Sequence, residues 1–294
     1  MPDDGQAMTE LRLDRRSSYQ QRPVVAMPVF AVRQGTRCRQ QDRLVAEEPL
    51  EIRVGGPDQE MTSLTVTMRT PRHDAELAMG FLYTEGLIHS RDDVIAVHDG
   101  DHPSAGHTCN VIAVRLAQNV DLAALKRHFT ATSSCGLCGK ASIQQLAVHC
   151  APVMPGPVVD GLVLMQLPKL MRQAQHVFEQ TGGLHAAGVF DQAGRMRAVR
   201  EDIGRHNAVD KLIGLLLHAG EVPLIDRLLL VSGRVSFEIV QKAAVAGAPI
   251  LCAVSAPSSL AIKAAHHFKM TIVGFLRDQS FNIYTHPERV ALEP

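Results

Sequence analysis

Two cysteines in a short polar segment are the residues of this sequence best suited to covalent chemistry. Cys135 and Cys138 lie two residues apart within residues 133–140, where two glycines allow the backbone to turn tightly. Apolar residues at helical spacing follow the segment, which predicts that this loop leads into a helix and that Cys138 lies near its N-terminus. The helix N-terminus and the ammonium group of Lys140 would both favour the thiolate form. A thiolate is the nucleophile for disulfide exchange and for accepting sulfur as a persulfide.

Three other interpretations of the cysteine pair compete with a reactive dithiol. A structural zinc site needs four ligands, and the sequence has no second Cys-x-x-Cys pair, only Cys109 and the adjacent His149 and Cys150. A thioredoxin-like site places its pair between a strand and a helix, whereas a predicted helix precedes this loop. The third interpretation, an inert buried pair of cysteines, does not fit a polar segment flanked by glycines. We therefore favour the reactive dithiol and expect no bound metal.

The bulk composition excludes several classes of protein. The chain of 294 residues has 30 basic and 30 acidic side chains, so its overall charge does not favour a polyanion. Aromatic residues make up 4% and tryptophan is absent, which argues against a surface that stacks nucleic acid bases. No apolar run approaches the ~20 residues of a membrane-spanning helix. Six cysteines are too few for a disulfide scaffold, so we expect a soluble protein of the reducing cytoplasm, without nucleic acid or membrane partners.

The sequence of the first half of the chain indicates a disordered tail followed by a small domain. Residues 1–21 are polar and lack the apolar stretch of a secretory signal, so we expect them to be a disordered tail. Residues 22–130 mix strands and helices without regular alternation, which predicts an α+β N-terminal domain. Its predicted elements are strands over 48–54, 61–69 and 111–116, and a helix that begins near Pro71 and Asp74 and ends at Gly86.

Residues 131–294 predict a second, larger domain of the α/β class. The expected elements are a helix over 168–180, then strands over 228–231, 250–254 and 271–276 that alternate with helices over 236–246 and 258–267. This order implies a parallel or mixed sheet within three layers. Residues 183–188, which include His185, look like the first zinc-binding element of nucleobase deaminases with alanine in place of the catalytic glutamate. We therefore expect a cytidine-deaminase-like three-layer fold without deaminase activity.

Polar segments at the ends of the predicted strands suggest an anion site. Residues 232–234, 255–259 and 277–278 each follow a strand, and residues 200–207 precede a helix. The carboxyl ends of strands and the N-termini of helices meet at one edge of an α/β sheet, where arginines and hydroxyl groups suit phosphate. The alternative is that Asp202 and Ser258 are ordinary helix caps and that the arginines are solvated. No Walker or Gly-x-Gly-x-x-Gly motif indicates a standard ATP or NAD site, and His206 is a candidate proton donor.

Long, ordered motifs from about residue 45 to residue 290 resemble the formate dehydrogenase accessory sulfurtransferase family, FdhD. The matching segments are residues 47–52, 70–86, 133–140, 183–190, 200–214, 232–259 and 274–290. The resemblance implies that Cys135 carries a persulfide received from a cysteine desulfurase and that Cys138 is a transfer or resolving partner. Sulfur would then pass to the molybdenum bis(molybdopterin guanine dinucleotide) cofactor of formate dehydrogenase.

The resemblance also implies a cofactor site, a homodimer and a deaminase-like fold. The resemblance and the polar segments at the strand ends together give the expected cofactor-binding residues. These are Phe275, Leu276, Arg277, Asp278, Gln279, Ser280, Ser232, Gly233, Arg234, Arg205 and His206. Asp278 and Gln279 differ from the glycine-rich family version of this loop. The alternative function is a non-catalytic chaperone that binds the cofactor for formate dehydrogenase.

Overall fold

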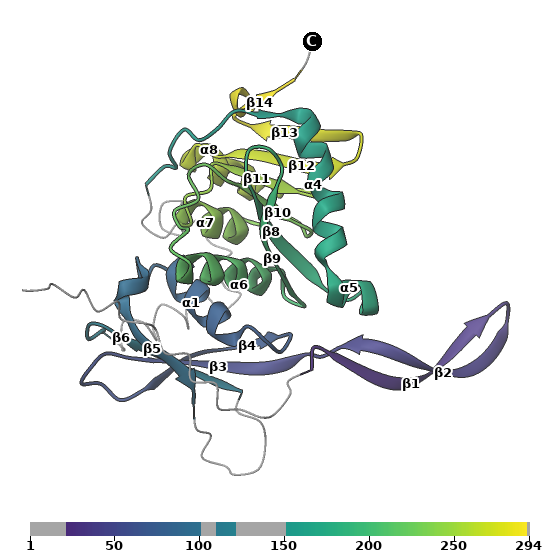
Figure 1. Ribbon diagram of the computed structural model, residues 1–294, viewed down its shortest axis with the longest axis horizontal. Coiled ribbons are helices and arrows are strands. Elements are labelled where there is room, and N and C mark those ends of the chain that lie inside the picture. Colours follow the sequence, from purple (N-terminus) through teal and green to yellow (C-terminus); the bar gives the residue numbers. More distant parts are fainter. Residues whose placement is uncertain (1–21, 101–109, 122–150, 293–294) are drawn as a thin grey trace, which may run out of the picture.

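The computed structural model describes residues 22–100, 110–121 and 151–292 (Figure 1). The predicted tail, residues 1–21, lies outside this part of the chain, as does the predicted domain boundary at residue 130. The mixed α/β class expected from the sequence is confirmed. The cytidine-deaminase-like layering and the division into two domains stay predictions.

A mixed six-stranded sheet forms the centre of the C-terminal part. Its strands are β8 (His185–Phe190), β9 (Met196–Asp202), β10 (Leu228–Val231), β11 (Ile250–Ala253), β12 (Thr271–Arg277) and β13 (Ser280–Thr285). They lie in the order β13-β12-β11-β10-β8-β9. The middle strands β10, β11 and β12 are parallel, whereas β8, β9 and β13 run antiparallel to their neighbours. The parallel strands are continuous apolar runs because both of their faces are buried.

Helices cover both faces of this sheet. One face packs against α6 (Arg205–His218), α7 (Phe237–Val245) and α8 (Ser259–Phe268), and the other packs against α4 (Gly161–Ala174). The α4 side chains Leu164, Leu167 and Met171 are completely or almost completely buried against the sheet. Short elements complete this part: α5 (His176–Thr181), β7 (Val159–Asp160) and β14 (Val290–Ala291).

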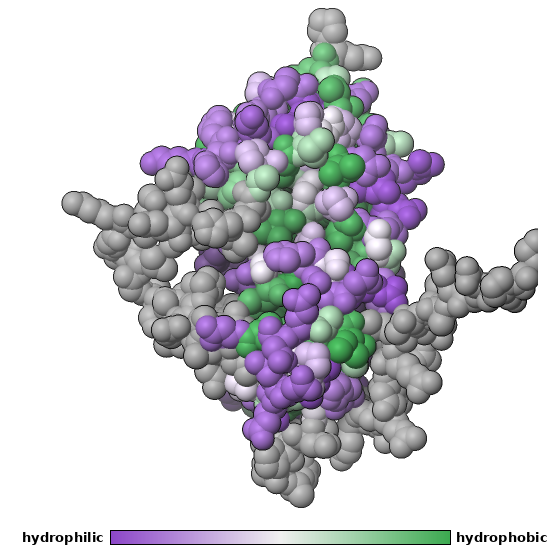
Figure 2. Space-filling view, turned by 90° about the vertical axis from the view of Figure 1, so that its left-hand side faces the viewer, coloured by the Kyte–Doolittle hydropathy of each residue, from purple (hydrophilic) through white to green (hydrophobic). Residues whose placement is uncertain are grey.

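A second sheet lies beyond the helices. Its strands β3 (Glu48–Gly55), β4 (Thr62–Arg69), β5 (Val94–Asp99) and β6 (Val111–Leu116) pair in the order β4-β3-β6-β5, and α1 (Asp74–Thr84) packs between this sheet and α6. One cluster of buried side chains extends from Leu50 of β3 to Ile272 of β12, so the two parts share a core. The face seen from the left-hand side of Figure 1 has hydrophobic residues along its middle, flanked by hydrophilic ones (Figure 2).

Two glycines allow α1 and α6 to approach closely. A Cβ atom added to Gly80 of α1 would clash with the backbone oxygen of Asp210, and one added to Gly214 of α6 would clash with that of Glu76. The two helix backbones are therefore in direct contact, which requires the absence of a side chain at both positions.

The structure corrects two parts of the sequence analysis. The helix predicted over 168–180 begins at Gly161 instead, because the side chain of Asp160 caps it by accepting a hydrogen bond from the Leu162 amide. Pro168 lies inside this helix, and α5 is a separate short helix. The hairpin of β1 (Val24–Arg33) and β2 (Thr36–Val45), which extends away from the rest of the protein, was not predicted from the sequence (Figure 1). No helix in the described ranges is long and apolar enough to span a membrane.

An ion pair between Glu76 of α1 and Arg200 of β9 predicts acid-sensitive stability. Arg200 donates two hydrogen bonds to the carboxylate, at 2.5 and 2.8 Å. Burial raises the pKa of Glu76, but the hydrogen bonds from Arg200 and His73 outweigh this effect and lower its pKa from 4.5 to about 2. The carboxylate therefore stabilises the fold fully above about pH 5, and this contribution of order 3 kcal/mol disappears as the pH falls from about 4.5 to 2.

The variant Glu76→Gln tests this pH dependence. The difference in unfolding free energy between wild type and variant, measured by urea denaturation, should shrink by more than half between pH 7 and pH 3. A difference that stays constant over this range would show that the ion pair does not set the acid response.

Candidate functional site

The strand order brings the predicted anion-binding segments to one edge of the central sheet. The carboxyl ends of β10, β11 and β12 meet there because the three strands are parallel. The antiparallel partner β8 begins at the same edge, since Val231 pairs with Ala187, and β9 ends there, since His185 pairs with Asp202. All four polar segments named from the sequence therefore lie along this edge.

Hydrogen bonds between neighbouring segments fix the shape of this edge. Ser232 and Ala186 exchange two hydrogen bonds, from the Ser232 amide to the Ala186 carbonyl and from the Ala186 amide to Oγ of Ser232, both at 2.9 Å. The Val235 amide donates to the carbonyl oxygen of Ala256, and the Phe275 amide donates to that of Ser255, each at 3.1 Å. The loops after β10 and β11 are thus connected to each other, and the loop after β11 is connected to strand β12.

Cationic side chains gather at the β8 and β10 end of the edge. Gly233 lies beside His185 and Arg205, since a Cβ added there would be 3.2 Å from Nδ1 of His185 and 3.6 Å from Cβ of Arg205. Burial lowers the pKa of His185, and the positive charges of Arg205, His206 and Arg234 lower it further. We call Arg205, His206 and Arg234, together with His185, whose lowered pKa favours the neutral imidazole, the cationic cluster. His185 was not among the binding residues predicted from the sequence, although its place at the start of a strand antiparallel to β10 puts it at this edge.

One carboxylate reaches this cluster through a salt bridge. Glu238, in the first turn of α7, lies 2.8 Å from Nε2 of His206. The hydrogen bond from His206 lowers the pKa of Glu238, so the carboxylate is ionised at neutral pH. Within the described part of the chain, Arg205 and Arg234 form no salt bridge, and Nε of Arg205 is buried without a hydrogen-bond partner.

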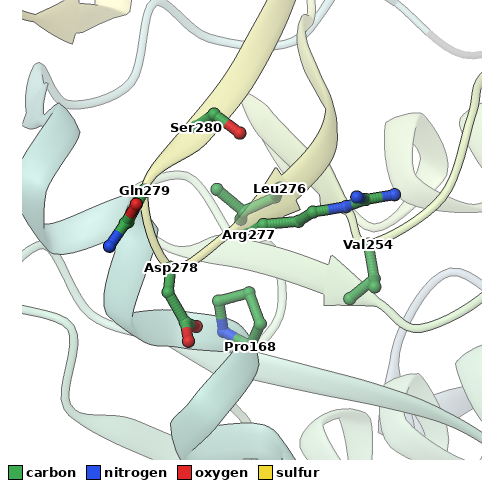
Figure 3. Close-up of a pocket in the computed structure, with 7 residues that line it drawn as sticks. All are labelled: Pro168, Val254, Leu276, Arg277, Asp278, Gln279 and Ser280. Atoms are coloured by element: carbon green, nitrogen blue, oxygen red, sulfur yellow. The ribbon is translucent and has the colours of Figure 1, made fainter.

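Five other predicted binding residues, Leu276 to Ser280, line a pocket at the β12 end of the same edge. The pocket measures about 500 Å³ and is lined by Pro168, Val254, Leu276, Arg277, Asp278, Gln279 and Ser280. The close-up shows Arg277 extending towards Val254 at the end of β11, whereas Asp278 points towards Pro168 of α4 (Figure 3). The structure therefore divides the predicted binding residues into two groups, the cationic cluster with its loop and this pocket, which we call the β12–β13 pocket.

Phe275 has a backbone conformation unusual for its residue type. Its φ of 50° lies in the left-handed region, and the pairing of β12 with β13 is irregular between Gly274 and Arg277. A non-glycine residue in this region costs energy and often marks a functional site. The bulge leaves the Phe275 side chain 39% exposed, although both neighbouring residues are buried. Phe275 does not line the pocket.

The predicted catalytic cysteines, Cys135 and Cys138, lie outside the described residues. Two other cysteines are described, Cys38 and Cys252, and both are free thiols. Burial raises the pKa of Cys252 to about 12, so it is not a nucleophile at neutral pH. Cys38 is exposed on β2. Among the described residues, no group of three His, Cys, Asp or Glu side chains is placed to hold a metal ion.

Comparison with known proteins gives consistent results. The model of the FdhD/NarQ family matches residues 45–291. The chain is 48% identical over 262 residues to the sulfur carrier protein FdhD of Mycolicibacterium paratuberculosis, which covers 87% of this chain and 94% of that protein. It is 43% identical to the protein of the same name from Sulfurisphaera tokodaii, over 91% of this chain and 99% of the relative.

A solved structure shows the same fold. The crystal structure of a formate dehydrogenase accessory protein from Desulfotalea psychrophila superposes with a TM-score of 0.70, at 22% sequence identity, over 92% of this chain and all of that chain. The family match spans both sheets and both parts of the candidate site. The chain therefore belongs to the FdhD/NarQ family.

Proposed function

We propose that this protein is a sulfur carrier that serves formate dehydrogenase. The observation that carries the proposal is the family match over residues 45–291, together with relatives named sulfur carrier proteins at 43 to 49% identity. The segment with Cys135 and Cys138 lies inside the matched range. Cys252 cannot compete for the chemistry because its thiol is buried and protonated.

The first chemical step is the transfer of one sulfur atom from a cysteine desulfurase to Cys135. The Cys135 thiolate attacks the terminal sulfur of the persulfide on the desulfurase. A new S–S bond forms on Cys135, the old S–S bond breaks, and the desulfurase cysteine leaves as a thiolate. The step involves no net oxidation or reduction, so it needs no other reactant.

The second step delivers the sulfur and uses Cys138 as the resolving thiol. The Cys138 thiolate attacks the inner sulfur of the Cys135 persulfide, which forms a Cys135–Cys138 disulfide and releases hydrosulfide. The two thiols supply the two electrons that convert sulfane sulfur to sulfide. A cellular dithiol reductant then restores the pair for another cycle.

The acceptor in this proposal is the molybdenum bis(molybdopterin guanine dinucleotide) cofactor, bound as a substrate. The cationic cluster and the β12–β13 pocket support it, because a guanine dinucleotide carries both phosphates and a base with hydrogen-bond donors. We further propose that the protein is a cytoplasmic homodimer. It would contact a cysteine desulfurase to receive sulfur and formate dehydrogenase to deliver it.

A transfer experiment tests this function. Formate dehydrogenase isolated from cells without the carrier should gain activity when it is mixed with the persulfide form of this protein, and the carrier should lose its added sulfur at the same time. If activity appears with the cofactor-loaded protein but does not depend on the persulfide, the chain is a non-catalytic chaperone for the cofactor.

A further inference from the structure

The hairpin of β1 and β2, residues 24–45, stands apart from the core of its own chain. It is attached at its base, where the Ala46 amide donates a 2.9 Å hydrogen bond to the carbonyl oxygen of Pro23 and Arg43 donates one to Gln180 of α5. Beyond this base it extends away from both sheets (Figure 1). We call this hairpin the arm. A two-stranded ribbon is marginally stable by itself in water, so the arm is expected to pack against a further surface.

The two faces of the arm both expose apolar side chains. The pairing of β1 with β2 has no register shift, so side chains alternate between the faces along each strand. Val25, Met27 and Leu44 are exposed on one face. Phe30 and Val32 lie on the other, where they are 66% and 67% exposed. Contiguous apolar side chains left open to water indicate a surface that binds another protein.

The arm is also strongly basic. Residues 22–45 contain five arginines and one acidic residue, Asp42, although the whole chain has equal numbers of basic and acidic residues. Arg39 lies directly opposite Phe30, and the guanidinium of Arg37 lies 5.2 Å from the centre of the Phe30 ring. Both arginines are exposed, and neither forms a salt bridge within the described residues. The arm therefore fits an acidic surface that also offers an apolar contact.

The four-stranded sheet and α1 have the opposite charge. Residues 46–100 and 110–121 contain twelve acidic and five basic side chains. Exposed carboxylates lie in the turn between β3 and β4, at Asp58 and Glu60, and just before β5, at Asp92. The turn and the start of β5 lie at the same end of the sheet, because β6 is parallel to β3 and antiparallel to β5. We call these three residues the acidic end, and Ile95 beside it is 52% exposed.

The arm cannot reach the acidic end of its own chain. The arm precedes the first residue of β3, whereas the acidic end lies beyond the last one. The eight residues of β3 put roughly 26 Å between them, at about 3.3 Å per residue. The arm also points away from the sheet in the opposite direction (Figure 1). A basic arm and an acidic end on opposite sides of one chain can therefore meet when two copies associate. About a twofold axis, each copy places its arm on the acidic end of the other, and the assembly closes at two chains.

We infer that the arm is a dimerisation element, whose face with Phe30, Arg37 and Arg39 docks on the acidic end of a second copy of this chain. This inference rests on the proposed function, because it assigns an interface to the proposed homodimer.

Two charge-reversal variants test this docking. The arm variant carries Arg37→Glu and Arg39→Glu, and the end variant carries Asp58→Arg and Glu60→Arg. Each variant brings like charges together in its own homodimer, so sedimentation equilibrium should give a dimer dissociation constant about 100-fold or more above that of wild type. All four side chains are exposed, so both variants should fold. The control Arg195→Glu, Lys263→Glu reverses two exposed cations of the C-terminal part and should leave the dissociation constant unchanged.

An equimolar mixture of the two variants should restore the dimer. In a mixed dimer the acidic arm of the first chain meets the basic end of the second, and the basic arm of the second meets the acidic end of the first. Attraction therefore returns at both contacts, and the dissociation constant should come back to within about tenfold of wild type. A mixture that stays monomeric, or an arm variant that dimerises as tightly as wild type, overturns the assignment.

Sulfur loading measured on the same samples separates this inference from the sulfur carrier function. A wild type that is monomeric, or one whose dimer does not depend on the arm, but that still gains sulfur from a desulfurase overturns the dimerisation role of the arm and leaves the carrier function standing. A wild type that forms the arm-dependent dimer but gains no sulfur does the reverse.

Discussion

Replacing Cys135 with alanine is expected to reduce formate dehydrogenase activity to background in cells that depend on this chain to mature the enzyme. Alanine has no thiolate to accept the sulfur atom, so the first step of the proposed reaction cannot occur. Activity in extracts, normalised to the amount of formate dehydrogenase protein, measures the effect.

Cys38→Ala is the matched control. It removes another thiol of the same chain from an exposed position on β2 and should retain full activity. If Cys135→Ala supports as much formate dehydrogenase activity as this control, Cys135 is not the sulfur acceptor. Cys138→Ala should still load sulfur but should transfer it more slowly, because it lacks the resolving thiol.

Replacing Lys211 with methionine should cause a large loss of stability. Its ammonium group is 2.6 Å from Asp202, and both side chains are almost completely buried. Lys211 also donates a hydrogen bond to the carbonyl oxygen of Thr70. Removal of the cation leaves a buried carboxylate without its counter-charge, which typically costs about 3 to 5 kcal/mol. Urea denaturation at pH 7 measures the change in unfolding free energy.

The double variant Asp202→Asn, Lys211→Met supplies the control for this prediction. It removes both charges and should recover part of the lost stability, because the unpaired charge is the main cost. A loss below about 1 kcal/mol in the single variant would contradict a strongly coupled buried pair.

The strands that the sequence predicted agree with the structure because their patterns are local, whereas β5, β8, β9 and β13 were not predicted. The strands over 111–116 and 228–231 have the predicted bounds, and the parallel strands stand out as short apolar runs between turns. The hairpin of β1 and β2 was missed because β2 is almost entirely polar and exposed. The signal for it was Gln34-Gly35, where two residues with positive φ form the turn between the strands.

The candidate site depended on contacts that no local pattern contains. Strand alternation placed residues 232–234 and 277–278 at one edge, but it could not show that Gly233 touches His185 or that Nε of Arg205 is buried. The close approach of Gly80 and Gly214 is likewise a property of two packed helices, since neither glycine marks a turn. Long-range packing therefore decides which of the predicted residues act together.

The most direct test of the sulfur carrier function is intact-protein mass spectrometry after incubation with a cysteine desulfurase and cysteine. Wild type and Cys38→Ala should each gain the mass of one sulfur atom, reductant should remove it, and Cys135→Ala should gain none. If wild type gains no sulfur while the desulfurase is active, the protein does not carry sulfur on a cysteine, and cofactor binding would be its remaining function.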